Sequence, residues 1–158
     1  MSTLKIVISI GDQTARLMDG EKQLKAFAIS SSINGTGCEF GSNATPLGRF
    51  KIYKKIGEGC VVGTVFKSRI PTGEICTESP RNELWQSTED LILTRILWLE
   101  GTENANANTR DRYIYLHGTN QEHLLGKPVS RGCIRLSNND VVELFALVEE
   151  GTEVNILV

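Results

Sequence analysis

Hydrophobic and polar positions alternate at the start of the chain. Residues 4–10 carry Leu or Ile at every even position, which is the period of a strand with one buried face. Turn residues follow at Gly11-Asp12 and again at Asp19-Gly20, and residues 13–18 and 23–30 lie on either side of the second turn. The pattern predicts an antiparallel meander of three strands.

Short apolar segments recur further along the chain, separated by clusters of Gly, Asn, Ser and Thr. Many short strands with turn signals between them indicate a sandwich or barrel, so we expect a mainly β fold of antiparallel type. No internal repeat or linker divides the chain, and residues 1–158 are predicted to form a single domain. The further strand-like segments are residues 50–56, 61–66, 91–99, 112–116 and 153–158.

One segment follows a helical period instead. From Val141 to Val148 the apolar residues stand at i, i+3, i+4 and i+7. Residues 137–140 read Ser-Asn-Asn-Asp and supply capping chemistry, and Gly151 stands where a left-handed C-terminal cap belongs. We therefore predict one clear helix near residues 139–149.

Two long polar segments, residues 31–49 and 101–111, are rich in Gly, Asn, Ser and Thr. Both are predicted to be loops. Such loops either connect elements through solvent or shape a binding site, and the sequence leaves both interpretations open.

Composition narrows the function classes. The chain has 158 residues, 40% of them hydrophobic and 23% charged, as in an ordinary globular protein. A net charge of −2 with scattered Lys and Arg argues against nucleic acid binding, and the longest apolar stretch, residues 91–99, is too short to span a membrane. The apolar run at residues 6–10 is shorter than the core of a signal peptide, so we expect a cytoplasmic protein. The oligomeric state is not indicated.

The four cysteines are Cys38, Cys60, Cys76 and Cys133, and no two of them have the Cys-x-x-Cys spacing of a zinc site. We therefore expect neither a metal nor another cofactor. The first three cysteines are interpreted as small buried apolar residues of a protein in a reducing compartment.

Cys133 has a different context. It lies in the segment Ser130-Arg131-Gly132-Cys133-Ile134-Arg135-Leu136, sixteen residues after His117 at the end of a predicted strand. A thiol is nucleophilic as the thiolate, and a nearby imidazole lowers the thiol pKa by becoming the cation that pairs with it. The cysteine and the histidine are therefore a candidate catalytic pair.

Together with the upstream segment Thr45-Pro46-Leu47-Gly48-Arg49-Phe50, these motifs resemble the L,D-transpeptidase catalytic domain, the YkuD family, over about residues 3–157. The resemblance implies an antiparallel β sandwich that acts on muropeptides, the stem peptides of peptidoglycan. In that chemistry a cysteine attacks the carbonyl of a meso-diaminopimelate residue, and the terminal D-alanine is released. Carried over by position, the resemblance makes Cys133 the nucleophile, His117 the base, and the backbone carbonyl of Gly118 the group that orients the imidazole.

Residues 130–132 are expected to support the nucleophile. Gly132 has no side chain, so it would let the backbone N–H groups around Arg131 and Cys133 approach the developing oxyanion. Ser130 would brace this turn by hydrogen bonding. Arg131 stands where the family often has His, so no proton-transfer role is expected for it.

Arg135 would lie on the same side of an extended segment as Cys133. It would either bind a substrate carboxylate through two parallel hydrogen bonds or form a structural salt bridge, and both alternatives stay open. His123 is interpreted as a surface residue. The residues interpreted as core or strand-face aromatics are Trp85, Trp98, Tyr113 and Tyr115.

After D-alanine leaves, the remaining peptide is bound to the cysteine as an acyl-enzyme. Either water or an amine can then attack this acyl group. Because a cytoplasmic location would supply dilute soluble stem peptides, we expect hydrolysis, which is L,D-carboxypeptidase activity in murein recycling. The alternatives are an L,D-transpeptidase that forms 3-3 cross-links or exchanges D-amino acids, and a non-catalytic module that binds muropeptides.

Overall fold

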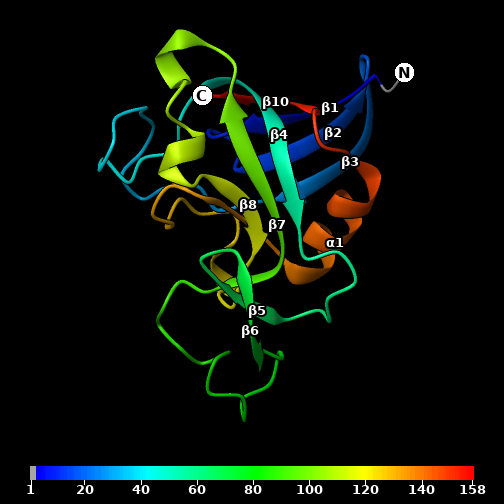
Figure 1. Cartoon of the computed structure of the whole chain (residues 1–158), viewed down its shortest axis with the longest axis vertical. Helices are drawn as coiled ribbons and strands as arrows, with labels where there is room; N and C mark the ends of the chain where they lie inside the picture. Colours follow the sequence, from blue (N-terminus) through cyan, green and yellow to red (C-terminus); the bar gives the residue numbers. More distant parts are fainter. Residues whose placement is uncertain (1–2) are drawn as a thin grey trace.

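The structure, a computed structural model, describes residues 3–158. It contains ten strands, one α-helix and three short 3-10 helices (Figure 1). The strands are β1 (Leu4–Ser9), β2 (Thr14–Asp19), β3 (Lys22–Ala28), β4 (Gly48–Ile56), β5 (Thr64–Lys67), β6 (Ile70–Ile75), β7 (Ile92–Gly101), β8 (Tyr115–Gly118), β9 (Ile134–Leu136) and β10 (Glu153–Leu157). The helices are α1 (Asn138–Leu147), η1 (Asn104–Asn106), η2 (Arg110–Arg112) and η3 (Glu122–Leu124).

The ten strands form one sheet in the order β3-β2-β1-β10-β4-β7-β5-β6, and β8 and β9 continue from β7. The predicted mainly β fold is confirmed, and so is the opening meander, because β1, β2 and β3 pair antiparallel. Two pairings correct the purely antiparallel expectation: β1 with β10 and β8 with β9 are parallel. Neither pair is joined by a hairpin, so no tight turn imposes the antiparallel direction.

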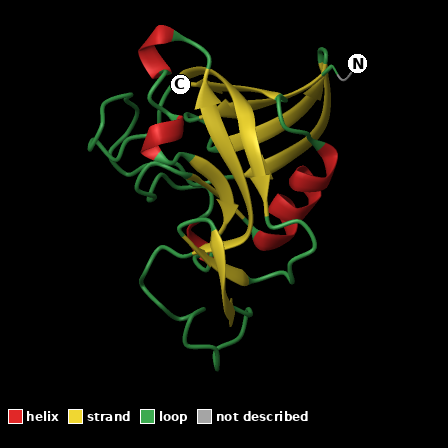
Figure 2. Cartoon of the chain, in the orientation of Figure 1, coloured by secondary structure: helices red, strands yellow, loops and turns green. Residues whose placement is uncertain are grey.

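The sheet curls so that distant strands share one core. Ile6 of β1, Phe50 of β4, Leu97 of β7 and Leu116 of β8 are all almost fully buried in the same cluster. The helix α1 adds Leu144 to this cluster and lies along one side of the sheet, against β7 and β8 (Figure 2). None of the helices in residues 3–158 is long and apolar enough to cross a membrane.

The predicted helix is confirmed within two residues at each end. Ser137 caps it, and its hydroxyl accepts a hydrogen bond from the Asp140 backbone N–H at 3.1 Å. The prediction for Gly151 is wrong, because the helix ends at the C-cap Val148. Gly151, with φ of 92°, serves the turn that leads into β10 instead.

Two strands, β6 and β9, were not predicted from the sequence, and two others begin later than predicted. All six residues of β6 are exposed, so this strand has no alternation of buried and exposed positions. The strand β9 has only three residues and all are buried. The strand predicted at 61–66 begins at Thr64, and the one predicted at 112–116 begins at Tyr115, because residues 110–112 form η2.

The first polar loop is solvated only in part. Residues 33–36 and 39–41 are exposed, whereas Ser32 and Thr45 are buried and Ser32 forms a bridge to Ser130. This loop therefore packs against the segment that carries Cys133. The second polar loop contains η1 and η2.

Candidate active site

The pairing of β8 with β9 gathers the predicted catalytic residues. His117 lies opposite Arg135 in the parallel register, and the Tyr115 backbone N–H donates to Cys133 Sγ at 3.3 Å. Because alternate residues of a strand share a face, His117 lies on the same face as Tyr115, and Cys133 on the same face as Arg135. The structure thus brings the histidine and the cysteine to one face of two neighbouring strands.

The Cys133 thiol is held by backbone groups on β8 and the residues before it. It accepts the Tyr115 N–H and donates to the Tyr113 carbonyl, 3.3 Å from Sγ. Burial raises the pKa of the Cys133 thiol to about 12, although the Tyr115 N–H and the positive charges of Arg135 and Arg112 oppose that shift. At neutral pH without substrate the thiol is therefore protonated, which differs from the thiolate and imidazolium pair expected from the sequence.

The imidazole of His117 is buried and fixed in orientation. Its Nδ1 lies 2.6 Å from the Gly118 carbonyl oxygen, and only 1% of the residue is exposed. A carbonyl only accepts hydrogen bonds, so this contact places the proton on Nδ1 and leaves the lone pair on Nε2. Burial lowers the His117 pKa, so the imidazole is a neutral base at neutral pH.

Gly118 sits at a point of close approach. A Cβ at this position would lie 2.4 Å from Asn138 Oδ1 and 2.8 Å from the Leu93 carbonyl oxygen. Any side chain here would push β8 away from α1 and β7. The glycine therefore keeps in place the carbonyl that orients His117.

The turn before the nucleophile is tied internally. The Ser130 hydroxyl donates to the Cys133 carbonyl at 2.6 Å and accepts the Gly132 N–H at 3.3 Å. Thr45 of the first polar loop donates through Oγ1 to the Gly132 carbonyl at 3.0 Å. Gly132 has φ of 129°, a conformation that side chains rarely allow. Ser130 thus makes the hydrogen bonds that the sequence predicts, and the Gly132 N–H donates to the Ser130 hydroxyl within the turn.

Arg131, in the same turn, has an exposed side chain.

Arg135 does not reach outward to a substrate. It is only 3% exposed, and its Nη2 pairs with Asp90 Oδ2 at 2.9 Å. Its Nη1 donates to Gln121 Oε1 at 2.9 Å. This is the geometry of the salt-bridge alternative. The Asp90 carboxylate also raises the His117 pKa, against the larger effect of burial.

Three functional neighbours were missed from the sequence: Asp90, Gln121 and Arg112. Asp90 and Gln121 lie in irregular segments that carry no motif. Arg112 donates to the carbonyls of Gly37 at 3.1 Å and Ala44 at 2.7 Å, which anchors the first polar loop beside the Cys133 turn. Its charge also lowers the pKa of the Cys133 thiol.

Two hollows are lined by neighbours of these residues, although neither lining includes Cys133 or His117. One, of about 250 Å³, is lined by Tyr113 and Arg131 beside the Cys133 turn. The other, of about 360 Å³, is lined by Phe66 and Asp90, the residue that pairs with Arg135.

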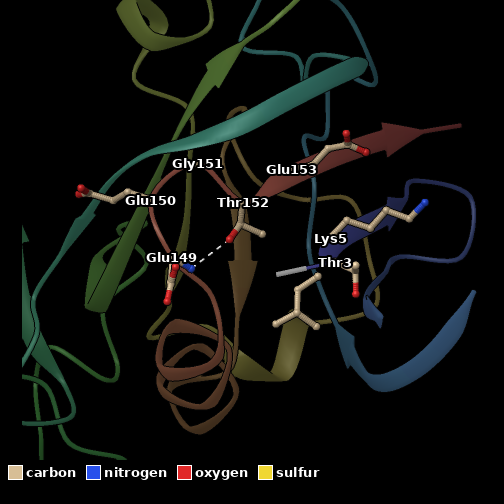
Figure 3. Close-up of a pocket in the computed structure, with 8 residues that line it drawn as sticks. Thr3, Lys5, Glu149, Glu150, Gly151, Thr152 and Glu153 are labelled. Atoms are coloured by element: carbon tan, nitrogen blue, oxygen red, sulfur yellow. Dashed lines mark hydrogen bonds between the residues drawn. The ribbon is translucent and has the colours of Figure 1, made fainter. Parts of the chain in front are cut away.

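A larger hollow of about 450 Å³ lies elsewhere, between the start of β1 and the segment that leads into β10 (Figure 3). Its lining includes Thr3, Lys5, Glu149 and Glu153 but none of the predicted site residues. Without a thiol or an imidazole it cannot support cysteine chemistry. Among residues 3–158, no group of three or more His, Cys, Asp or Glu side chains could hold a metal ion.

Comparison with known proteins identifies related sequences. The family model "L,D-transpeptidase catalytic domain" (YkuD) matches residues 4–156. The L,D-transpeptidase YkuD of Bacillus licheniformis is 40% identical over 88 residues, which is 55% of this chain and 50% of that protein. YqjB of Bacillus subtilis, also named as an L,D-transpeptidase, is 50% identical over 50 residues, 31% of this chain and 28% of that protein. The matches thus span about half the length of these curated relatives or less.

Solved structures share the fold. An L,D-transpeptidase from Xylanimonas cellulosilytica matches with a TM-score of 0.61 at 18% identity, over 98% of this chain and 60% of that chain. L,D-transpeptidase 3 from Mycobacterium tuberculosis, in complex with a faropenem-derived adduct, matches with a TM-score of 0.61 at 16% identity, over 99% of this chain and 61% of that chain. At these identities the likeness concerns the fold alone.

Proposed function

The chain belongs to the L,D-transpeptidase catalytic domain family, and we propose that it performs acyl transfer on peptidoglycan stem peptides with Cys133 as nucleophile. One observation carries the proposal. His117 of β8 and Cys133, the residue before β9, face the same side of the strand pair, and the contact of Nδ1 with the Gly118 carbonyl leaves Nε2 as the proton acceptor. This is the arrangement of a nucleophile, a base and a group that orients the base.

In the first step the thiol attacks the carbonyl of the meso-diaminopimelate residue while His117 takes the Sγ proton. Because both groups are neutral at rest, proton transfer accompanies the attack rather than preceding it. Backbone N–H groups of the turn around Cys133 stabilise the oxyanion. The tetrahedral intermediate then expels D-alanine, whose amine takes the proton back from His117, and a thioester remains on Sγ.

The second step transfers the acyl group to water, which makes the enzyme an L,D-carboxypeptidase that leaves a tripeptide. The four cysteines are all free, as in a protein of a reducing compartment, and this supports a cytoplasmic location. There the substrates would be soluble muropeptides released during wall recycling, and water would meet little competition from amines. Fractionation of cells with an antibody against the chain tests the location.

Transfer to an amine is the second candidate function. It requires room for a second peptide beside the acylated one. The two hollows, one lined by Arg131 of the Cys133 turn and the other by Asp90, the partner of Arg135, are candidate places for that peptide, although neither is lined by Cys133 or His117. This observation favours an L,D-transpeptidase that forms cross-links or exchanges D-amino acids.

Mass spectrometry of a disaccharide tetrapeptide incubated with the protein, with and without an added D-amino acid, separates the candidates. Hydrolysis yields tripeptide and free D-alanine in both mixtures. Transpeptidation yields a 3-3 linked dimer, or a tetrapeptide that carries the new D-amino acid. Unchanged tetrapeptide that nonetheless binds the protein would indicate a non-catalytic muropeptide-binding module and contradict the proposal.

A further inference from the structure

A guanidinium group lies over two neighbouring aromatic rings, Trp98 and Tyr113, whose centroids are 5.8 Å apart. The Cζ atom of Arg69 is 5.0 Å from the ring centroid of Trp98 and 4.7 Å from that of Tyr113. Its Nη1 donates to the Tyr115 hydroxyl at 3.0 Å. Stacking and hydrogen bonding therefore fix the position of a long side chain that is usually mobile.

The residues that hold Arg69 are the ones that hold the thiol. Cys133 Sγ donates to the Tyr113 carbonyl and accepts the Tyr115 N–H, both at 3.3 Å. Cys133 also packs against the cluster that contains Tyr115. The Arg69 guanidinium is thus attached, through two side chains, to the same short segment of backbone that positions the nucleophile.

The charge of Arg69 is not neutralised. Within residues 3–158, no carboxylate forms an ion pair with it, whereas Arg135 pairs with Asp90 and Arg110 with Glu100. The hydrogen bond to Tyr115 raises the Arg69 pKa, so the group stays cationic. A guanidinium stacked on rings keeps N–H groups in its plane available, and these match a carboxylate bidentately.

Arg69 occupies an unfavourable backbone position. It forms the two-residue tip of the β5–β6 hairpin with Ser68, and φ is 66° for Arg69 and 49° for Ser68. Turns of this kind favour Asn and Gly, because other side chains are strained at positive φ. An arginine at this tip costs stability, and its contacts with the rings beside Cys133 offset that cost.

We propose that Arg69 binds a carboxylate of the stem peptide adjacent to the scissile bond, a specificity role that rests on the acyl transfer proposed above. The sequence suggested this role for Arg135, which is buried and paired with Asp90. Two carboxylates of the substrate fit: the terminal carboxylate of D-alanine, and the free carboxylate on the side-chain stereocentre of meso-diaminopimelate.

The test compares kcat/KM for the tetrapeptide and for two amidated forms, one at each carboxylate. In the wild-type protein, amidation of the recognised carboxylate lowers kcat/KM by about 10- to 100-fold, the range for hydrogen bonds to charged groups. Arg69→Ala lowers it to a similar extent for the free acid and causes little further loss for that amide. Arg69→Lys keeps the charge but not the bidentate geometry, so it restores only part of the rate.

Arg110→Ala is the matched control, because Arg110 lies 4.8 Å over the Tyr53 ring of the same aromatic cluster but pairs with Glu100. It leaves the preference for the free acid unchanged. An Arg69→Ala protein that retains the wild-type preference for the free acid overturns the inference, as does one that loses activity equally on acid and amide. A wild-type protein that turns over none of the peptides refutes the proposed acyl transfer itself, and the Arg69 inference with it.

Discussion

The β8–β9 pair and the β5–β6 hairpin share the cluster of Phe66, Tyr115 and Cys133, yet the outer strand of the hairpin, β6, differs sharply from β8 and β9. Every residue of β8 and β9 is buried, whereas every residue of β6 is exposed. The buried pair contains the neutral imidazole of His117 and Arg135, which is paired with Asp90, and the thiol of Cys133 directly precedes β9. The turn between β5 and the exposed strand β6 carries Arg69, which pairs with no carboxylate among the described residues. His117 thus lies in the core and Cys133 at its edge, whereas the arginine inferred to meet the substrate carboxylate stands at a hairpin tip.

The largest effect is expected in the buried pair. Cys133→Ala should abolish turnover, because no other group can form the thioester, and Cys133→Ser should be nearly as inactive, because a hydroxyl is far harder to deprotonate. Steady-state release of D-alanine measures this. Both variants should keep the circular dichroism spectrum of the wild type, and substantial activity in Cys133→Ala would remove the thiol from the mechanism.

The next largest loss of activity is expected for substitution of His117. His117→Ala should lower kcat/KM by about 10²- to 10⁴-fold, as for loss of a general base. Since burial lowers the His117 pKa and raises that of Cys133 to about 12, wild-type kcat/KM should fall only below about pH 6.5, the ordinary pKa of His, and stay level above it. Alkylation of Cys133 without substrate should be slow at pH 7 and accelerate as pH rises. Fast alkylation at pH 6 would indicate a preformed thiolate.

A substitution at Asp90 tests whether the ion pair with Arg135 stabilises the buried β8–β9 pair. Asp90→Asn leaves Arg135 buried without its counterion and should cost about 3–5 kcal/mol of unfolding free energy, measured by urea denaturation. Because the Asp90 carboxylate raises the His117 pKa, its removal should also move the acid limb of the pH profile to lower pH. Asp90→Glu is the control that keeps the charge. An unchanged denaturation midpoint in Asp90→Asn would show that the pair is not structural.

The smallest effect is expected on the hairpin. Ile70 is 66% exposed on β6, so Ile70→Thr should change the unfolding free energy by no more than about 0.5 kcal/mol. The matched change in the buried strand, Ile134→Thr, places a smaller side chain with a hydroxyl at a fully buried position and should be strongly destabilising. If the two variants had equal denaturation midpoints, the predicted difference in stability between the buried strand β9 and the exposed strand β6 would be wrong.

The same contrast explains what the sequence could predict. Alternation in residues 4–10 marks a strand with one buried face, and the spacing from Val141 to Val148 marks a helix, so both elements follow from local pattern. The fully exposed β6 and the three-residue β9 have no period to detect.

Within the site, motif residues were accessible to sequence reasoning and their partners were not. The segments around His117 and Cys133 carry recognisable motifs. The pairing of Arg135 with Asp90 and the contacts of Arg69 with Trp98 join residues far apart in the chain, and the sheet order that brings them together is set by long-range strand pairing. The pKa of Cys133 likewise depends on burial, which no local motif records.

Intact-protein mass spectrometry of the enzyme mixed rapidly with tetrapeptide tests the central claim most directly. The account predicts an adduct equal to the tripeptide acyl group, located on Cys133 by proteolytic mapping and absent from Cys133→Ala, with one D-alanine released for each adduct formed. Release of D-alanine by Cys133→Ala, or an adduct mapped to any other residue, would contradict the account.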